Sequence, residues 1–222
     1  VRQERRMLMK KGCILCLLIS VISLPLIAQN IIYSNLKELL TQHGDTTAVL
    51  RVEKRSRNQI VLTGGADYRI TAGDDESMCR RLKKRCFAVR DEKGNLYLNC
   101  RKLRYKKLRF GAWYAPAVQL GKNIYFCAMP LGSVIGGNFV EEDDVKLGGN
   151  IGDALAASSL VTKRVCYELN GETGKVDFLG KDRMLQLLKN YPELKQAYLK
   201  DDSQEAKHTF KYLLELQNKQ KK

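Results

Sequence analysis

The hydrophobic pattern divides the chain into a leading apolar run, a long middle part of short segments, and a tail with helical spacing. In the middle part, runs rich in β-branched and aromatic residues are separated by polar links that contain glycine, which is typical of antiparallel hairpins. From residue 182 onward, apolar residues recur at helical spacing. The pattern predicts an α+β fold: an antiparallel meandering sheet built from hairpins, with helices mainly C-terminal.

The hairpins are predicted from strand-like runs on either side of turn residues. In the clearest one, strands 87–90 and 96–100 flank a turn with Gly94, a residue that tolerates positive φ. The other expected pairs are 110–120 with 124–129, 159–169 with 175–179, and 47–52 with 59–63, the last followed by a short strand at 66–71. Together these segments account for the whole predicted sheet.

Helices are predicted at both ends of the sheet region. Short helices are expected within 30–41, across 77–84 and over the small-residue segment 151–159, and the other helices lie in the tail. Side chains that accept a hydrogen bond from the first backbone N–H groups favour helix starts, and proline favours the first turn. The candidates for these positions are Ser34 or Asn35 in the first helix and Asp182, Pro192 and Asp202 in the tail.

The first 28 residues follow the order of a secretory signal peptide. Two lysines precede an apolar run, Pro25 interrupts it, and Ala28 stands before Gln29 at the expected cleavage point. The run is shorter than the roughly 20 residues that a helix needs to cross a bilayer, although an uncleaved membrane anchor is the alternative. We therefore expect residues 1–28 to be a signal peptide and residues 29–222 to form a single basic domain, exported to the periplasm or cell envelope of a Gram-negative bacterium.

Five cysteines remain after the expected cleavage, and their spacing matches no zinc-binding pattern. Cys100, Cys127 and Cys166 each lie in an apolar, strand-like stretch, so we expect them to be buried free thiols. Cys79 and Cys86 are the only pair close in sequence, and either a bridge between them or two free thiols is compatible with export.

Positive charge is concentrated in one segment of the chain. The formal net charge is +15, and residues 80–109 hold thirteen Lys and Arg residues against only Asp91 and Glu92. Hairpin strands return beside each other, so these cations are expected to share one electropositive face, where aromatic rings can add stacking contacts. The candidate binding residues are Arg101, Lys102, Arg104, Lys106, Lys107 and Arg109, with Tyr105 and Trp113 as the aromatic members.

The charge indicates the class of partner more than its identity. A basic face on an exported protein suits an anionic lipid, an acidic glycan or an envelope protein. A solvated face without a specific ligand is the alternative interpretation. Nucleic acid is disfavoured because an exported protein rarely meets it and because the sequence has no DNA- or RNA-binding motif. We therefore expect a non-enzymatic protein that binds something anionic.

No sequence motif predicts a catalytic residue, a metal ligand or a cofactor. The glycines from Gly132 to Gly137 lack the Lys-Ser/Thr pair of a phosphate-binding loop. The acidic run 141–144 lacks the alternating ligand positions of a calcium loop. His43 and His208 lie in no nucleophile motif. A hydrolase-like enzyme that uses residues distant in sequence is the alternative to a binding protein.

Three blocks of the chain resemble a known group of proteins. These are residues 100–105 with 113–116, residues 148–156 with 174–176 farther along, and residues 187–194. Together they resemble uncharacterised exported proteins of Bacteroidetes-type bacteria. The resemblance covers most of the chain after residue 28 and implies export, but the group has no assigned activity and implies no functional residues.

Overall fold

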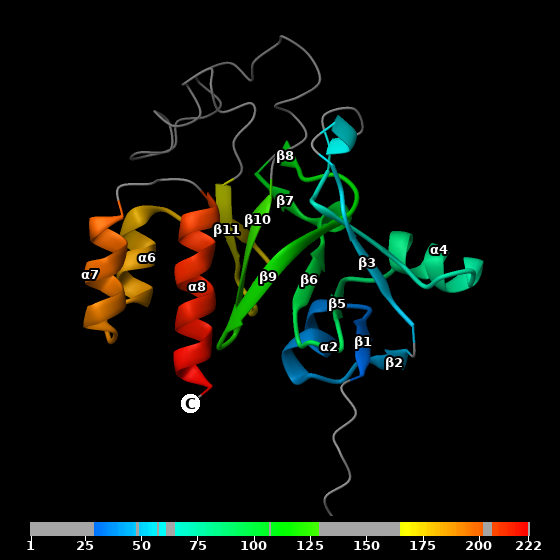
Figure 1. Cartoon of the computed structure of the whole chain (residues 1–222), viewed down its shortest axis with the longest axis horizontal. Helices are drawn as coiled ribbons and strands as arrows, with labels where there is room; N and C mark the ends of the chain where they lie inside the picture. The colour runs from blue at the N-terminus through cyan, green and yellow to red at the C-terminus, as the bar shows by residue number, and fades with distance from the viewer. Residues whose placement is uncertain are drawn as a thin grey trace, which may run out of the picture.

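The computed structural model describes residues 29–47, 49–56, 58–60, 65–106, 108–128, 165–201 and 206–221. The main strands are β1 (Asn30–Tyr33), β2 (Asp45–Thr47), β3 (Arg51–Lys54), β4 (Tyr68–Thr71), β5 (Ala88–Arg90), β6 (Leu96–Asn99), β9 (Tyr114–Leu120), β10 (Asn123–Ala128), β11 (Val165–Leu169) and β12 (Val176–Phe178). They pair antiparallel in the order β12-β11-β10-β9-β6-β5-β1-β2, and β4 joins the hairpin β3–β4 to β9. This sheet and its helices confirm the predicted α+β class (Figure 1).

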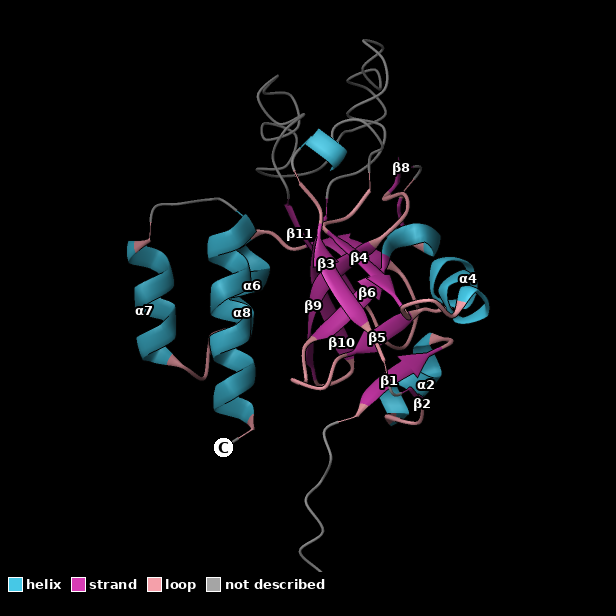
Figure 2. Cartoon of the chain, turned by 45° about the vertical axis from the view of Figure 1, so that its right-hand side comes forward, coloured by secondary structure: helices cyan, strands magenta, loops and turns pink. Residues whose placement is uncertain are grey.

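Helices cover the sheet on two sides. They are α2 (Leu36–Thr41), α4 (Glu76–Lys84), α6 (Lys181–Leu187), α7 (Pro192–Lys200) and α8 (Ala206–Gln220), with a 3-10 turn η1 (Cys100–Lys102) and a small separate hairpin of β7 (Arg104–Tyr105) and β8 (Leu108–Arg109). The C-terminal helices lie on one side of the strands and α4 lies on the other, as both Figure 1 and Figure 2 show. In the described part of the chain, no helix has the length and apolarity needed to cross a membrane.

The sheet curls around a shared interior. The largest buried cluster contains Tyr33 from β1, Leu98 from β6, Phe126 from β10 and Tyr167 from β11, which come from distant positions in the strand order. Phe126 and Tyr167 stack, with ring centroids 5.6 Å apart. Aromatic pairs add to the stabilisation that burial alone provides. This interior core therefore holds the two halves of the sheet together.

Two further clusters attach the covering elements to the outside of the sheet. One contains Met184 and Leu213 from the C-terminal helices with Val118 and Tyr125 from β9 and β10. The other joins the side of the sheet near β1, β5 and β6 to α4 and to the β3–β4 hairpin. Leu82, the fully buried residue of α4, belongs to this second cluster. The position of α4 is thus fixed by burial of its one apolar face.

The first predicted helix is shorter than expected. Residues 30–33 form β1, because this segment pairs with β2 on one side and with β5 on the other. The helix α2 follows, and Asn35 is its N-cap, as one of the two expected candidates: its side chain accepts a hydrogen bond from the Glu38 N–H at 2.9 Å. The Glu38 carboxylate in turn accepts a hydrogen bond from the N–H of Ser34, the residue before the N-cap.

The predicted hairpins after residue 66 are confirmed, whereas the earlier one is wrong. β3 pairs with β4, the strand expected at 66–71, instead of with residues 59–63. Gln59 and Ile60 form a helical turn, and residues 61–64 lie outside the described ranges. Arg55 explains the change, because its guanidinium donates to the carbonyls of Gln59 and Ala66 and folds the connection back on itself.

The tail helices follow the sequence pattern with one correction. Pro192 is the first residue of α7, as predicted. α6 begins after Gly180, and Asp182 lies in its first turn instead of at the N-cap. A carboxylate in the first turn still interacts favourably with the helix dipole. Asp202 and the expected helix 151–159 lie outside the described residues.

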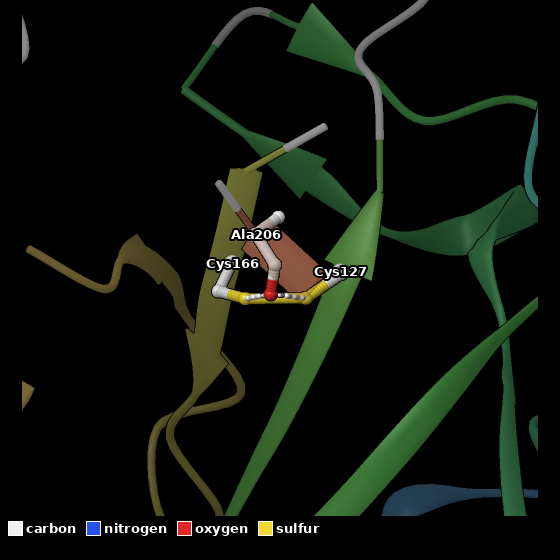
Figure 3. Close-up of a disulfide and its surroundings, with 3 residues drawn as sticks. All are labelled: Cys127, Cys166 and Ala206. Carbon is white, nitrogen blue, oxygen red and sulfur yellow. Dashed lines mark hydrogen bonds between the residues drawn. A yellow bond between two sulfur atoms is a disulfide. The ribbon is translucent and has the colours of Figure 1, made fainter. Parts of the chain in front are cut away.

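A disulfide bridge joins Cys127 and Cys166, which corrects the expectation of two free thiols. The two residues are direct register partners on β10 and β11, with Cα atoms 4.2 Å apart. Both are buried, and their sulfur atoms lie 3.6 and 3.4 Å from the carbonyl oxygen of Ala206 at the start of α8 (Figure 3). The expected free thiol of Cys100 is confirmed, and Cys79 and Cys86 are also free.

Removing the bridge with Cys127→Ala and Cys166→Ala is expected to lower the free energy of unfolding by about 4 kcal/mol. The bridge closes a sequence separation of 39 residues, which restricts the unfolded chain by about that much. Urea denaturation measures the effect, with Cys79→Ala as the control for loss of a free thiol. Equal urea midpoints for the double variant and the wild type would contradict the prediction.

Candidate functional site

The end of α4 and the start of η1 are held together by one side chain. Asn99, the last residue of β6, is buried, and its amide donates to the carbonyls of Leu82 and Cys86 at 3.2 and 2.9 Å. The carbonyl oxygen of the same side chain accepts from the Arg101 N–H at 3.1 Å and caps η1. Two basic segments that are well separated in sequence therefore meet at one end of the β5–β6 hairpin.

The exposed cations of the candidate site lie at the end of α4, in η1 and in the hairpin that follows η1. We call the following set the basic surface: Lys83, Lys84 and Arg85 at the end of α4, Arg101 and Lys102 in η1, and Arg104, Lys106 and Arg109 in the β7–β8 hairpin. Each of these side chains is exposed, and none forms an ion pair with a described residue. Lys107, another predicted site residue, lies outside the described ranges.

The thirteen cations of residues 80–109 do not all share this location. Arg90 and Lys93 lie at the turn of the β5–β6 hairpin, at the opposite end from η1. Arg90 donates to the Gly94 carbonyl there. Arg81 forms an ion pair with Asp45 of β2 and is thereby neutralised. Arg81, Arg90 and Lys93 therefore lie outside the basic surface.

Like charges face each other in the β7–β8 hairpin. Arg104 and Arg109 are direct register partners, and such a pair is destabilising when it lacks a counter-ion. Lys106, at the turn between them, has a φ of 52°. Non-glycine residues seldom adopt this left-handed conformation. The hairpin therefore carries a like-charge repulsion that an anionic ligand would offset, whereas the positive φ of Lys106 suits the two-residue turn.

Tyr105 is not a surface residue, which corrects its assignment as a stacking side chain. It is 6% exposed and belongs to the interior core, where its ring centroid lies 5.5 Å from that of Tyr167. Burial raises the pKa of its hydroxyl, and the nearby charge of Asp177 raises it further. The ring of Tyr105 thus anchors the β7–β8 hairpin to the sheet. Its sequence neighbours Arg104 and Lys106 are exposed.

Trp113 lies beside the basic surface but interacts with other arginines. Its carbonyl accepts from the Cys100 N–H at 3.0 Å, next to η1. The guanidinium carbons of Arg55 and Arg69 lie 5.2 and 5.8 Å from the centre of its ring, within the range of cation–π attraction. Sequence reasoning missed both arginines because they lie outside the basic run. The register of β4 against β9 is what brings Arg69 to this place.

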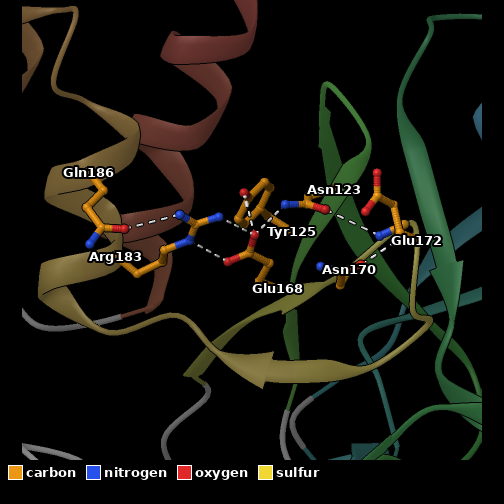
Figure 4. Close-up of polar contacts among 8 residues, drawn as sticks. Asn123, Tyr125, Glu168, Asn170, Glu172, Arg183 and Gln186 are labelled. Atoms are coloured by element: carbon orange, nitrogen blue, oxygen red, sulfur yellow. Dashed lines mark hydrogen bonds and ion pairs between the residues drawn. The ribbon is translucent and has the colours of Figure 1, made fainter.

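A buried carboxylate forms the other concentration of ionisable groups. Glu168 of β11 accepts two hydrogen bonds from Arg183 of α6, both at 2.8 Å, and others from Asn123 and Tyr125 (Figure 4). Burial raises the pKa of Glu168, but these hydrogen bonds and the charge of Arg183 outweigh burial, so the net pKa is below its ordinary value. Both carboxylate oxygens are engaged, so this cluster attaches α6 to the sheet.

The two histidines lie apart from the basic surface in the fold. His208 is half-buried, and its Nδ1 lies 2.9 Å from a carboxylate oxygen of Asp201. His43 is exposed, and its Nδ1 lies 2.6 Å from the Thr41 carbonyl oxygen. Within the described ranges, no group of three or more His, Cys, Asp or Glu residues is placed to hold a metal ion.

Comparison with known proteins identifies one family. A family model described as a family of unknown function, DUF6563, matches residues 31–220. The match confirms the expectation of an uncharacterised family. No curated protein and no solved structure matches the chain.

Replacing Arg183 by Leu is expected to lower the free energy of unfolding by about 2 kcal/mol at pH 7. The value lies between those of buried and exposed ion pairs, since Glu168 is buried and the Arg183 side chain is 42% exposed. Because the folded pKa of Glu168 is depressed, the difference from wild type should shrink as the pH falls below about 4.5. Denaturation across this pH range measures it, with Lys181→Leu as the control. A difference in unfolding free energy that stays constant with pH would refute the depressed pKa of Glu168.

Proposed function

The chain belongs to DUF6563, a family of unknown function, and we propose that this member is an exported, non-enzymatic binding protein. Its basic surface binds an anionic component of the cell envelope: a lipid head group, an acidic glycan or an acidic face of an envelope protein. The chemistry common to these ligands is clustered negative charge. Arginine and lysine side chains bind such groups by charge-assisted hydrogen bonds.

The junction at Asn99 is the observation that carries this proposal. It joins the ends of α4 and η1, two segments that carry exposed cations, and no ion pair with a described residue offsets these charges. Concentrated charge of one sign costs folding free energy through self-repulsion, yet it attracts and steers ligands of opposite charge. A bound polyanion would remove the repulsion. This arrangement therefore favours binding over a merely solvated face.

Export is supported by two independent features. The first 28 residues have the pattern of a signal peptide. The bridge between Cys127 and Cys166 is the kind of bond that persists in oxidising compartments and is rare in the cytosol of mesophiles. Both features agree with a site of action in the periplasm or cell envelope.

The Glu168 cluster supports a non-enzymatic role. A catalytic carboxylate needs an oxygen that is accessible to a substrate and a proton to exchange. Glu168 is 9% exposed, and the hydrogen bonds from Asn123, Tyr125 and Arg183 occupy both of its oxygens. A binding function that uses the exposed cations therefore fits the described residues better than hydrolysis does.

Binding is tested by elution from heparin with two variants of equal net charge. The first variant changes Lys83, Lys84, Arg101 and Lys102 to Gln. The control changes Lys175, Lys181, Lys189 and Lys200 to Gln, all of them exposed and remote from Asn99 in the sequence. The first variant is expected to elute at clearly lower salt than the wild type and the control, because the ligand contacts are local. Identical elution of both variants would show that only net charge matters.

Export is tested by the mass of the protein recovered from the cell envelope. A chain that starts at Gln29 and carries the Cys127–Cys166 bridge is the expected product, since cleavage follows Ala28 and the compartment is oxidising. Intact mass measured with and without reductant reports both properties. A mature chain that retains residues before Gln29, or one with reduced Cys127 and Cys166, would contradict the assignment.

A further inference from the structure

We propose that Trp113 and the arginines beside it form a binding site for phosphate groups, in which Arg69 of β4 contacts the ligand. This inference rests on the proposed function and specifies its centre and its ligand chemistry. It also extends the ligand-binding region beyond the basic surface, because Arg69 belongs to a different hairpin. The phosphate can belong to a lipid head group or be free in solution.

The strand register brings the members of this site together. Tyr114, the first residue of β9, pairs with Asn99 of β6 and also with Tyr68 of β4. Continuing these two antiparallel registers by one residue places Trp113 between Cys100 and Arg69. The contacts agree with this placement, since the Trp113 carbonyl accepts from the Cys100 N–H and its ring lies near the Arg69 guanidinium.

The backbone at Trp113 is held in an unusual conformation. Its φ is 80°, which is rare for a bulky L-residue. The loop before it is fixed from the other side, because the Ala66 N–H donates to the Ala112 carbonyl at 3.0 Å and Gly65 lies so close to that carbonyl that a Cβ would clash. Apart from the helix cap Gln42, only Lys106 and Trp113 have positive φ among the described non-glycine residues. Such conformations concentrate at ligand sites.

The two arginines over the Trp113 ring have different roles. Arg55 is 7% exposed and donates to two backbone carbonyls, so it supports the ring from the protein side. Arg69 is exposed; its register partner on β3 is Glu53, and no described residue forms an ion pair with Arg69. Packing on the ring restricts its guanidinium, whose planar fork matches two oxygens of a phosphate group. Arg69 is therefore oriented for a ligand before the ligand arrives.

Trp113 is the only tryptophan of the chain, so its fluorescence reports on this site alone. The experiment titrates the protein with sodium pyrophosphate and, separately, with vesicles that contain phosphatidylglycerol, while neutral phosphatidylcholine vesicles serve as the reference. A saturable change in Trp113 emission is expected with at least one of the two anionic probes. A response to pyrophosphate identifies free phosphate as a source, and a response to the anionic vesicles alone identifies a lipid head group.

Variants at Arg69 assign the response to the proposed contact. Arg69→Gln is expected to weaken the apparent affinity about tenfold, the effect of losing a charge-assisted hydrogen bond, and Arg69→Lys should recover part of it. Arg51→Gln, at the other end of the β3–β4 hairpin, is the matched control and should titrate like the wild type. Thermal unfolding verifies that each variant is folded. Both arginines are exposed, so folding should be preserved.

Two results would overturn this inference. One is an unchanged Trp113 emission with both anionic probes, and the other is an equal affinity of Arg69→Gln and wild type. If either occurs while heparin retention still depends on Lys83, Lys84, Arg101 and Lys102, the proposed function stands and only the phosphate site at Trp113 fails. If heparin retention is lost equally in the control variant, the proposed function itself fails.

Discussion

The hydrogen bonds of the Asn99 side chain are the constraint on which the arrangement of the basic surface depends. Asn99 is 4% exposed and ends β6 at the point where the chain turns into η1. Its side-chain amide donates hydrogen bonds to the carbonyls of Leu82, in α4, and Cys86, just after this helix. Its side-chain oxygen accepts a hydrogen bond from the Arg101 N–H and caps η1. A buried amide with all of these partners fixes one geometry, because leaving any partner unpaired inside the protein is costly. The neutral side chain of Asn99 thus joins two positively charged segments, the ends of α4 and η1.

The curled sheet explains why this junction lies at a fixed place. Its interior core holds β6 and β9 in register with the strands on either side. The buried cluster that contains Leu82 packs α4 against the outer face of the sheet. The Tyr114 hydroxyl donates to the Leu82 carbonyl at 2.7 Å, so β9 also holds the end of α4. On the far part of the sheet, Glu168 binds Arg183 of α6, and the Cys127–Cys166 bridge joins β10 to β11. The helical layer and the basic surface are thereby built on separate parts of one scaffold.

The sequence predicted the local elements well and the long-range pairings poorly. Hairpins were correct where the turn contains glycine with positive φ, as at Gly94 and Gly121, because such turns fix the register locally. β1 was predicted as helix because its pairing with β2 and β5 is not local. The Cys127–Cys166 bridge was missed for the same reason.

The candidate site was predicted in part. The exposed cations of η1 and β7–β8 follow directly from composition, whereas Tyr105 was misassigned because an aromatic ring beside cations can point either way from a strand. Arg69 gives no signal in the sequence except its place in a short strand, and only the register of β4 against β9 brings it to Trp113. Long-range register is therefore the information that a single sequence lacks.

Anionic ligands are proposed to bind where Asn99 joins α4 to η1. The most direct test of this proposal is a two-dimensional amide NMR titration of the isotope-labelled protein with a short heparin oligosaccharide. Saturable shift changes are expected only in residues 83–85, in residues 99–106, at Arg109 and in the neighbourhood of Trp113. Shift changes centred on Lys93 at the opposite end of the β5–β6 hairpin, or on the helices α6 to α8, would contradict it.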